Sequence, residues 1–256
     1  SGVEVITGSA GDDSVTVSTN DIEAISGGSG IDDVTLTDAS GNTVDLAGVE
    51  VITGSDGSDI LTVTDDTSVM LDGGDGADTF SGNAADNTLR GMRGNDRLEG
   101  QAGDDQLIGG AGNDQLIGGD GVDTASFAGS TVMVNADLAM GQAFGTETGL
   151  DTFDGIENLL GGGGDDVLSG DAGANIISGG AGDDTLVGRG GSDTLVGGVG
   201  IDTVSFEGET SSISINLETG VAVSDGTGSD TITGVENIFA GDGNDFLVGD
   251  SDDNVL

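Results

Sequence analysis

Residues 91–126 read Gly-Met-Arg-Gly-Asn-Asp-Arg-Leu-Glu, Gly-Gln-Ala-Gly-Asp-Asp-Gln-Leu-Ile, Gly-Gly-Ala-Gly-Asn-Asp-Gln-Leu-Ile and Gly-Gly-Asp-Gly-Val-Asp-Thr-Ala-Ser. These are four consecutive nonamers of the pattern G-x-x-G-x-D-x-U-x, in which U is apolar. Their aspartates fall nine residues apart, at Asp96, Asp105, Asp114 and Asp123. One such nonamer alone would favour a solvated loop. A phase that is kept over four copies indicates a repeat architecture instead.

Each position of the nonamer has a physical role. Glycines at the first, second and fourth positions allow a tight turn through positive φ and let backbone carbonyls gather around one point. The aspartate adds a charged oxygen at that point. The last three residues favour a short strand in which alternation sends only U inward. A cation that accepts six to eight oxygen ligands in irregular geometry suits such a turn, and Ca²⁺ tolerates that irregularity better than Mg²⁺.

This pattern resembles the repeats of the RTX (repeats-in-toxin) family, the hemolysin-type calcium-binding repeats. The resemblance covers about half of the chain strictly and most of it loosely. It implies an all-β fold, an elongated right-handed parallel β-roll, which is a calcium-stabilised β-solenoid. In this family two nonamers form one coil, and each ion lies between a turn and the equivalent turn 18 residues on. Such proteins typically leave the bacterial cell unfolded by type I secretion and fold outside.

Composition excludes several classes of function. The 256 residues include 52 glycines, no Pro, Cys, His, Trp or Tyr, and a formal charge of −44. A chain this acidic does not bind nucleic acid or anionic lipid through its own charge. Without His, Cys or Lys it has no imidazole or thiolate metal site, Ser–His pair or Schiff-base lysine. It has no apolar run of transmembrane length, and no membrane insertion by this chain is expected. Leu256 stops inside a repeat, so we expect a section of a longer protein.

The chain divides into six segments by sequence pattern. The first carries a looser repeat, because Gly2–Gly8 returns as Gly48–Gly54, and its coils are expected to be wider. The segments are 1–72 (degenerate, wide coils), 73–126 (regular nonamers), 127–160 (insertion), 161–205 (regular nonamers), 206–239 (insertion) and 240–256 (nonamers, truncated).

The two insertions are copies of each other at an offset of 79 residues. Asp123–Phe127 matches Asp202–Phe206, and Gly155–Asn158 matches Gly234–Asn237. Each contains an alternating apolar strand, a turn at Met140-Gly141 or its copy, and a second strand. We therefore predict a β-hairpin or a widened coil that projects from the roll.

The candidate calcium ligands follow from the nonamer phase. The main ones are Asp13, Asp32, Asp59, Asp78, Asp96, Asp105, Asp114, Asp123, Asp166, Asp184, Asp193, Asp202 and Asp245. Further candidates are the in-phase amides and glutamates and the turn carbonyls: Asn87, Asn175, Asn254, Glu157, Glu236, Gly109, Gly110, Ala111, Gly112, Gly179, Gly180, Ala181 and Gly182. The in-phase glutamates either bind an ion or face water. We expect roughly a dozen ions between turns 18 residues apart, weaker beside the two uncharged residues Asn87 and Asn175.

No catalytic group is expected. The acids recur with the coils, which makes them structural, and Glu147, Glu207 and Glu209 lie outside the ladder without a matching copy. The sequence therefore favours a non-catalytic calcium-binding module of a secreted or cell-surface bacterial protein, such as an adhesin. The tail of a secreted protease, lipase, polysaccharide-modifying enzyme or toxin is an alternative, and a carbohydrate- or ice-binding module is another. The expected partners are calcium and, for the parent protein, the type I secretion machinery; any surface ligand is open.

Calcium is expected to control folding. Carboxylates of stacked turns about 5 Å apart repel by about 3 kcal/mol at an effective dielectric near 20. Burying one U residue contributes only about 2 kcal/mol, against the ordering entropy of nine residues. Ion binding is thus expected to supply the folding free energy.

Overall fold

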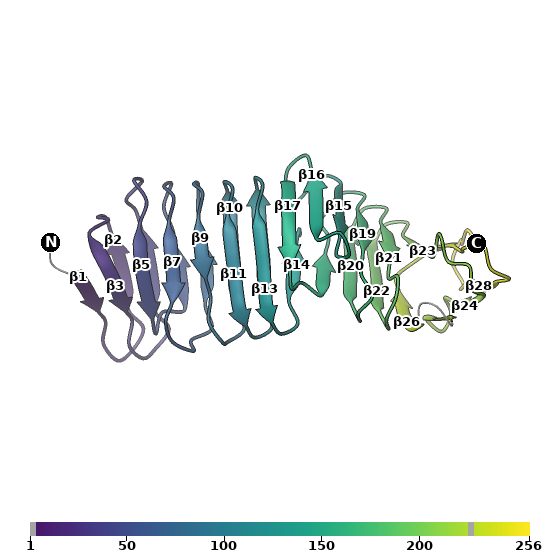
Figure 1. Ribbon diagram of the computed structural model, residues 1–256, viewed down its shortest axis with the longest axis horizontal. Helices are drawn as coiled ribbons and strands as arrows, with labels where there is room; N and C mark the ends of the chain where they lie inside the picture. Colours follow the sequence, from purple (N-terminus) through teal and green to yellow (C-terminus); the bar gives the residue numbers. More distant parts are fainter. Residues whose placement is uncertain (1–3, 225–227) are drawn as a thin grey trace. The chain divides into compact units, whose positions relative to one another are not determined.

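The computed structural model describes residues 4–224 and 228–256, and within these ranges the chain is all-β, with strands and turns but no helix (Figure 1). The described part therefore has no helix long enough to cross a membrane. The chain divides into two compact units. One comprises residues 1–125 and 148–156, and the other comprises residues 126–147 and 157–256. Each is a parallel β-solenoid, which confirms the predicted fold class.

In the first unit, successive strands alternate between two sheets (Figure 1). One sheet has the order β1 (Glu4–Thr7), β3 (Ile22–Ser26), β5 (Thr43–Ala47), β7 (Ile60–Val63), β9 (Thr79–Ser81), β11 (Arg97–Ala102), β13 (Gln115–Asp120) and β17 (Gly149–Asp154). The other has the order β2 (Ser14–Val17), β4 (Asp33–Leu36), β6 (Val51–Thr53), β8 (Met70–Asp72), β10 (Thr88–Arg93), β12 (Gln106–Ala111) and β14 (Thr124–Ser126).

The register of these strands follows the nonamer. Leu89 pairs with Leu107 and Leu98 with Leu116, so one coil is two nonamers. All four leucines are fully buried, as expected of position U. Alternation along a strand sends the neighbours of each leucine outward, and only one apolar residue per nonamer enters the core. The core is therefore a narrow row of U side chains with a turn at each edge of the coil.

Residues 4–72 form coils of uneven length. Val15 pairs with Val34, Ala24 with Asp45, and Val44 with Leu61, so the step between paired residues varies. The cores of these coils hold β-branched and aliphatic residues such as Leu46 and Ile52, both fully buried. The roll thus tolerates loops of different length as long as each strand places an apolar residue inward.

The second unit repeats the same architecture. One sheet has the order β16 (Gln142–Gly145), β15 (Val134–Asp137), β19 (Val167–Ser169), β21 (Thr185–Val187), β23 (Thr203–Ser205) and β27 (Asn237–Phe239). The other has the order β18 (Asn158–Leu160), β20 (Ile176–Ala181), β22 (Thr194–Val199), β26 (Gly228–Thr233), β25 (Val221–Ser224), β24 (Ile213–Asn216) and β28 (Phe246–Val248).

Both copied insertions contain a β-hairpin, as predicted. β15 pairs antiparallel with β16, and β24 pairs antiparallel with β25. The hairpins do not project, however, which corrects that expectation. β15 pairs parallel with β19, and β24 with β28, because the inward residues Ala136 and Ile215 continue the buried row. The insertions are therefore extra strands within the sheets of the roll.

Candidate calcium sites

The predicted aspartates form ladders along the edges of the coils, at the point where each turn meets a strand. Asp78, Asp96 and Asp114 are each at most 2% exposed. One oxygen of each carboxylate, Oδ1, accepts a hydrogen bond from the backbone N–H of the ladder residue one coil earlier. The Asp78 N–H donates to Asp96 and the Asp96 N–H to Asp114, both at 2.8 Å. We refer to one such series of turns as a stack.

The same geometry joins every pair of aspartates that the sequence placed 18 residues apart. The Asp105 N–H donates to Asp123, the Asp166 N–H to Asp184 and the Asp184 N–H to Asp202, each at 2.8 Å. Asp13 and Asp32 also pair, at 2.8 Å. The remaining predicted aspartates accept from other segments: Asp59 from Asn42, Asp193 from Asn175 and Asp245 from Ile213.

Glycine is needed in these turns because backbone and carboxylate crowd the space of a side chain. A methyl group built on Gly91 would overlap Asp96 Oδ2 and lie 2.6 Å from the carbonyl oxygen of Gly109. The second residue of most turns also has positive φ, including Gly110 (98°) and Gly180 (109°). The first and second positions of the nonamer thus gather the carbonyls and the carboxylate around one point.

In most turns the second carboxylate oxygen, Oδ2, is buried without a hydrogen-bond partner. We refer to these as open turns. Among the described residues, the predicted ligands of this type are Asp32, Asp78, Asp96, Asp105, Asp114, Asp184, Asp193 and Asp202. A buried carboxylate oxygen without a partner costs several kcal/mol unless a cation or proton satisfies it. The open turns therefore fit a bound cation.

Other turns satisfy the same oxygen internally, and we refer to these as closed turns. The N–H of the second residue of the nonamer donates to the side-chain oxygen four residues later. Ser9 donates to Asp13 at 2.7 Å, Ser55 to Asp59 at 2.8 Å and Gly162 to Asp166 at 2.8 Å. Asp171 donates to Asn175 and Asp250 to Asn254 in the same way. None of these five donor residues has positive φ.

The closed turns share a position in the stacks. The turn of Asp59 follows a loop ending at Asn42, which is not a nonamer, and the turn of Asp166 follows the hairpin residue Val134. The turn of Asn175 follows the Glu157 segment, whose carbonyl oxygen accepts from Asn175 Nδ2 at 2.7 Å. The turns of Asp78, Asp96, Asp114, Asp184 and Asp202 each follow another G-x-x-G-x-D turn, and they are open. The three closed turns named here are each the first turn after a segment that is not such a turn.

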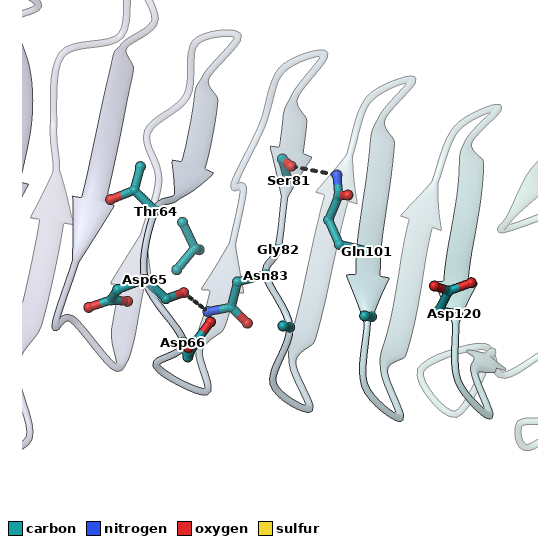
Figure 2. A pocket seen from close by; sticks show the side chains of 11 residues that line it. Thr64, Asp65, Asp66, Ser81, Gly82, Asn83, Gln101 and Asp120 are labelled. Carbon is teal, nitrogen blue, oxygen red and sulfur yellow. Dashed lines mark hydrogen bonds between the residues drawn. The ribbon is translucent and has the colours of Figure 1, made fainter.

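Asn87 begins a stack in a different way. Its Nδ2 donates to the Ala85 carbonyl oxygen at 2.6 Å and to Asn83 Oδ1 at 3.2 Å, and its Oδ1 accepts from the Val69 N–H at 3.2 Å. Figure 2 shows the groove beside this turn, about 520 Å³ in volume, where Asn83 donates to the Asp65 carbonyl oxygen at 2.6 Å. Both the oxygen and the nitrogen of the Asn87 side chain therefore have hydrogen-bond partners, whereas Oδ2 of an open turn has none.

The positively charged side chain of Arg189 lies beside the closed turn of Asn175. Arg189 donates to the Gly170 carbonyl oxygen at 2.6 Å and to both carboxylate oxygens of Asp137, at 2.7 and 2.6 Å. These bonds to Arg189 hold the pKa of the Asp137 carboxyl below its usual value. Arg189 is one of three non-glycine residues with positive φ in the described part of the chain. It is also the only Lys or Arg of the second unit.

Two in-phase glutamates take the place of a ladder aspartate. Glu50 Oε2 accepts from the Asp32 N–H at 2.7 Å, and Glu236 Oε2 accepts from the Asp202 N–H at 2.8 Å. Glu236 and Glu157 are both partly exposed, as are Asp13, Asp245 and Asn254. The longer side chain thus reaches the ladder position, although its turn lacks the first two glycines of a nonamer.

The predicted carbonyl ligands lie in the two most regular turns. Gly109 and Gly179 are buried directly beneath Asp114 Oδ2 and Asp184 Oδ2. Gly110, Gly112, Gly180 and Gly182 all have positive φ. The Ala111 carbonyl oxygen accepts from the Gly94 N–H at 2.8 Å, and Ala181 is exposed. As ligands for an ion, the glycine carbonyl oxygens are therefore better placed than the carbonyl oxygen of Ala111, which already accepts a hydrogen bond.

Two ladder aspartates, Asp151 and Asp230, were not among the ligands predicted from the sequence. Asp151 and Asp230 lie in the copied insertions, yet both are 1% exposed and both leave Oδ2 without a partner. Their distance from the preceding ladder residue is 37 residues, so a search at nine or 18 does not find them. The signal that could have found them is G-x-D-x-U, the second half of a nonamer, at Gly149–Phe153 and Gly228–Ile232.

A second, exposed ladder runs beside the first and was also missed. It is formed by the fifth residue of each nonamer, which is often Asp or Asn. The Asn113 N–H donates to Asn95 and the Asp104 N–H to Asp86, both at 2.8 Å, and the Asp183 N–H donates to Asp165 at 2.9 Å. These bonds fix the stacking of the turns from the solvent side.

The electrostatics of the open turns favour a neutralising ligand. Burial raises the pKa of Asp78 and of Asp151 to about 7, against the opposing effect of the N–H bond each accepts. Burial likewise raises the pKa to about 6 at Asp105, Asp114, Asp184 and Asp193. Neighbouring carboxylates of the same stack add to the rise. Without a bound cation, these groups of the folded chain therefore take up protons at a higher pH than an exposed aspartate does.

The donor set suits calcium. All candidate ligands are oxygens, from carboxylates, glycine carbonyls and amides, which hard cations prefer. No cluster of three or more acidic side chains that could hold a metal forms among the residues described. An ion in an open turn would thus take most of its ligands from the backbone, as Ca²⁺ readily does.

Comparison with protein families matches this geometry to a known repeat. The model of the RTX calcium-binding nonapeptide repeat (4 copies) matches residues 72–107, 90–125, 151–186, 169–204 and 223–256. Comparison with curated proteins gives no match. The matched ranges cover more than half of the chain and contain most of the open turns. The chain therefore belongs to the family of RTX calcium-binding nonapeptide repeat proteins.

Proposed function

We propose that the chain is a non-catalytic structural module whose repeats fold when calcium binds between stacked turns. The observation that carries this proposal is the row of buried Oδ2 oxygens without partners in the open turns, such as Asp96 and Asp184. Nearly all of these carboxylates are also stacked on another carboxylate one coil away. A divalent ion satisfies the free oxygens and turns the repulsion within a stack into attraction. Binding free energy then becomes folding free energy.

The acids outside the ladders support a structural rather than a catalytic role. Glu147 accepts from the Thr131 N–H at 2.9 Å and from its hydroxyl at 3.1 Å, which ties down the base of the first hairpin. The Glu209 carbonyl oxygen accepts from the Asp242 N–H at 2.8 Å.

We further propose that the parent protein is exported by bacteria through type I secretion and works outside the cell, where calcium is abundant. The charge of −44 supports this, because repelling carboxylates keep the chain unfolded where calcium is scarce. A section of an adhesin or surface protein suits a repeat that carries only strands and turns. The tail of a secreted enzyme or toxin is the alternative.

The test is a far-UV circular dichroism titration of the purified chain. In excess EDTA we expect a spectrum without β-structure. Calcium should restore the β-signal cooperatively in the micromolar-to-millimolar range, and magnesium should not. Equilibrium dialysis at saturating calcium should then count roughly a dozen ions. Native β-structure in EDTA, or equal recovery in magnesium, would contradict the proposal.

A cavity on the first hairpin favours a second candidate function, carbohydrate binding. It measures about 390 Å³ and is lined by Asn135, Asp137, Met140, Gln142, Phe144, Val167 and Ser169. Phe144 is 50% exposed there, and a half-exposed aromatic ring beside amides and a carboxylate suits the face and the hydroxyls of a sugar. A glycan array probed with the calcium-loaded chain and with Phe144→Ala tests it. Binding that survives the substitution, or no binding at all, would reject this candidate.

A further inference from the structure

The first insertion ends in the sequence Thr148-Gly149-Leu150-Asp151-Thr152-Phe153, which has the order of the second half of a nonamer. In the structure this segment belongs to the first unit and forms β17, which pairs parallel with β13. Thr152 pairs with Gln115 and Phe153 with Leu116. The segment therefore takes the place that the next nonamer would have held on the stack of Asp114.

The geometry at Asp151 matches that of a regular open turn. The Asp114 N–H donates to Asp151 Oδ1 at 3.0 Å, and the Leu150 N–H donates to Asn113 Oδ1 at 2.8 Å. Gly149 has a φ of 84° and approaches Gly112 so closely that a methyl group built on it would overlap the Gly112 carbonyl oxygen. Both ladders thus continue across the insertion.

Three buried side-chain oxygens of these two stacked turns have no hydrogen-bond partner. They are Asp151 Oδ2, Asp114 Oδ2 and Thr148 Oγ1. Asp151 is 1% exposed and Thr148 is 5% exposed, whereas Ala111, the third residue of the preceding turn, is exposed. Neither aspartate takes part in a salt bridge within the described ranges. Two buried carboxylates on one stack therefore have no positively charged side chain as an ion-pair partner among the described residues.

We propose that a calcium ion binds between the turn of Asp114 and residues 148–151, an additional site made by ladder residues 37 positions apart. The inference rests on the proposed function, since it takes calcium as the ligand of the open turns. Asp114 and Asp151 supply the carboxylates, and the close backbone approach of Gly112 and Gly149 supplies carbonyl oxygens. The row of ions then passes the insertion without a break.

The second insertion repeats the arrangement in the second unit. The Asp193 N–H donates to Asp230 Oδ1 at 3.0 Å, and Oδ2 of both aspartates is buried without a partner. Gly228 has a φ of 92° and lies against the Gly191 carbonyl oxygen, as Gly149 lies against that of Gly112. We therefore assign an equivalent site to Asp193 and Asp230.

The experiment counts calcium ions in the full chain and in Asp→Asn variants. Asparagine keeps an oxygen that can accept the N–H of the preceding turn, so Asp151→Asn removes charge with little change of shape. The matched control is Asp154→Asn, an exposed aspartate on the same strand. Bound calcium is measured by equilibrium dialysis and atomic absorption at saturating calcium, with circular dichroism as the readout of folding.

We expect Asp151→Asn and Asp230→Asn each to bind one ion fewer than the wild type, and the double variant two fewer. Asp154→Asn should bind the wild-type number. Counts for Asp151→Asn and Asp230→Asn equal to that of the control would overturn the inference while leaving the proposed function intact. A wild-type chain that binds no calcium would instead refute the proposed function. If Asp151→Asn does not fold at any calcium concentration, the count for Asp230→Asn decides.

Discussion

The turns of Asp166 and Asp184 differ in state although their sequences are nearly the same. Gly-Gly-Gly-Gly-Asp-Asp leads to Asp166 and Gly-Gly-Ala-Gly-Asp-Asp leads to Asp184. Asp166 Oδ2 accepts from the Gly162 N–H at 2.8 Å, whereas Asp184 Oδ2 is buried without a partner. The turn before Asp166 in the stack is a hairpin, and the turn before Asp184 is that of Asp166.

The difference shows that a nonamer does not determine its own ion site. A closed turn satisfies its carboxylate with its own backbone, so it needs no ion to be stable. An open turn follows another nonamer turn in its stack, and we propose that a cation satisfies its free oxygen. The family motif therefore marks turns that are able to bind, and the neighbour in the stack decides which of them leave an oxygen free.

The largest effect should come from pH, because it acts on every open turn at once. The pKa of Asp78 is about 7 and that of Asp114 about 6 in the folded, ion-free chain, against about 4 for an unfolded aspartate. Between pH 4 and 7 the folded chain thus binds more protons than the unfolded chain. The ion-free fold should gain stability as pH falls through this window and lose it as pH rises.

Because the aspartates of the unfolded chain are ionised between about pH 5.5 and 7.5, the ion-free chain must take up protons in order to fold. In excess EDTA the β-signal should therefore increase when the pH is lowered from about 7.5 to 5.5. Circular dichroism in EDTA at a series of pH values measures this effect, and a signal that does not depend on pH would contradict the raised pKa values of the open carboxylates.

The next largest effect is expected for Asp114→Ala in the middle of a stack. The change removes a carboxylate that faces two neighbouring turns and leaves the buried Asp96 N–H without its acceptor. We expect the calcium midpoint to rise about tenfold, which corresponds to about 1.4 kcal/mol. Glu209→Ala, outside the ladders, is the control and should leave the midpoint unchanged. An equal shift in both variants would mean that net charge, and not the ladder, sets the midpoint.

The pair Asp184→Asn and Asp166→Asn tests the difference between open and closed turns directly. Both variants lose one charge and keep an acceptor for the N–H of the preceding turn. Asp184→Asn should raise the calcium midpoint severalfold, because an open turn loses its ion ligand. Asp166→Asn should shift it less than about twofold, since this turn loses the acceptor of the Gly162 N–H but no free oxygen that an ion would bind. Equal shifts would remove the distinction between the two classes of turn.

The smallest effect concerns backbone strain at the second position of the nonamer. Met92 has a φ of 76°, a conformation that costs a non-glycine residue about 1 kcal/mol, so Met92→Gly should stabilise the calcium-loaded chain by less than that amount. The same change in a closed turn, Ser55→Gly, should destabilise by about 1 kcal/mol, because Ser55 Oγ donates to the Asp38 carbonyl oxygen at 3.0 Å. Urea unfolding at saturating calcium measures both, and changes of the same sign would contradict this prediction.

Much of the fold could be predicted from the sequence because its determinants are local. The phase of the nonamers places Leu98 and Leu116 in the core and brings Asp96 next to Asp114. The alternation in each insertion predicts a hairpin. The joining of β15 to β19 could not be predicted, because it depends on which sheet edge the hairpin meets after the chain has folded.

The candidate site was harder to predict for the same reason. Asp151 lies in a half-repeat, and only the stacking of β17 on β13 reveals its place in the ladder. The closed state of Asp59 depends on the loop that ends at Asn42, a contact between segments 17 residues apart that do not share a motif. Residue identity can be read from the nonamer, but the hydrogen-bond state of its carboxylate cannot.

The ladder bonds also give each stack a direction. Within a stack, each carboxylate accepts from the coil before it, as Asp96 accepts from Asp78 and Asp114 from Asp96. The last coil of a stack therefore presents a backbone N–H that can donate to the acidic side chain of the next coil. A coil that arrives shifted by one residue brings the neighbouring residue to that amide and turns its leucine away from the core. Only the coil that brings both an acid and an apolar residue in phase forms this hydrogen bond and buries its leucine. The stack therefore favours the correct register for each added coil.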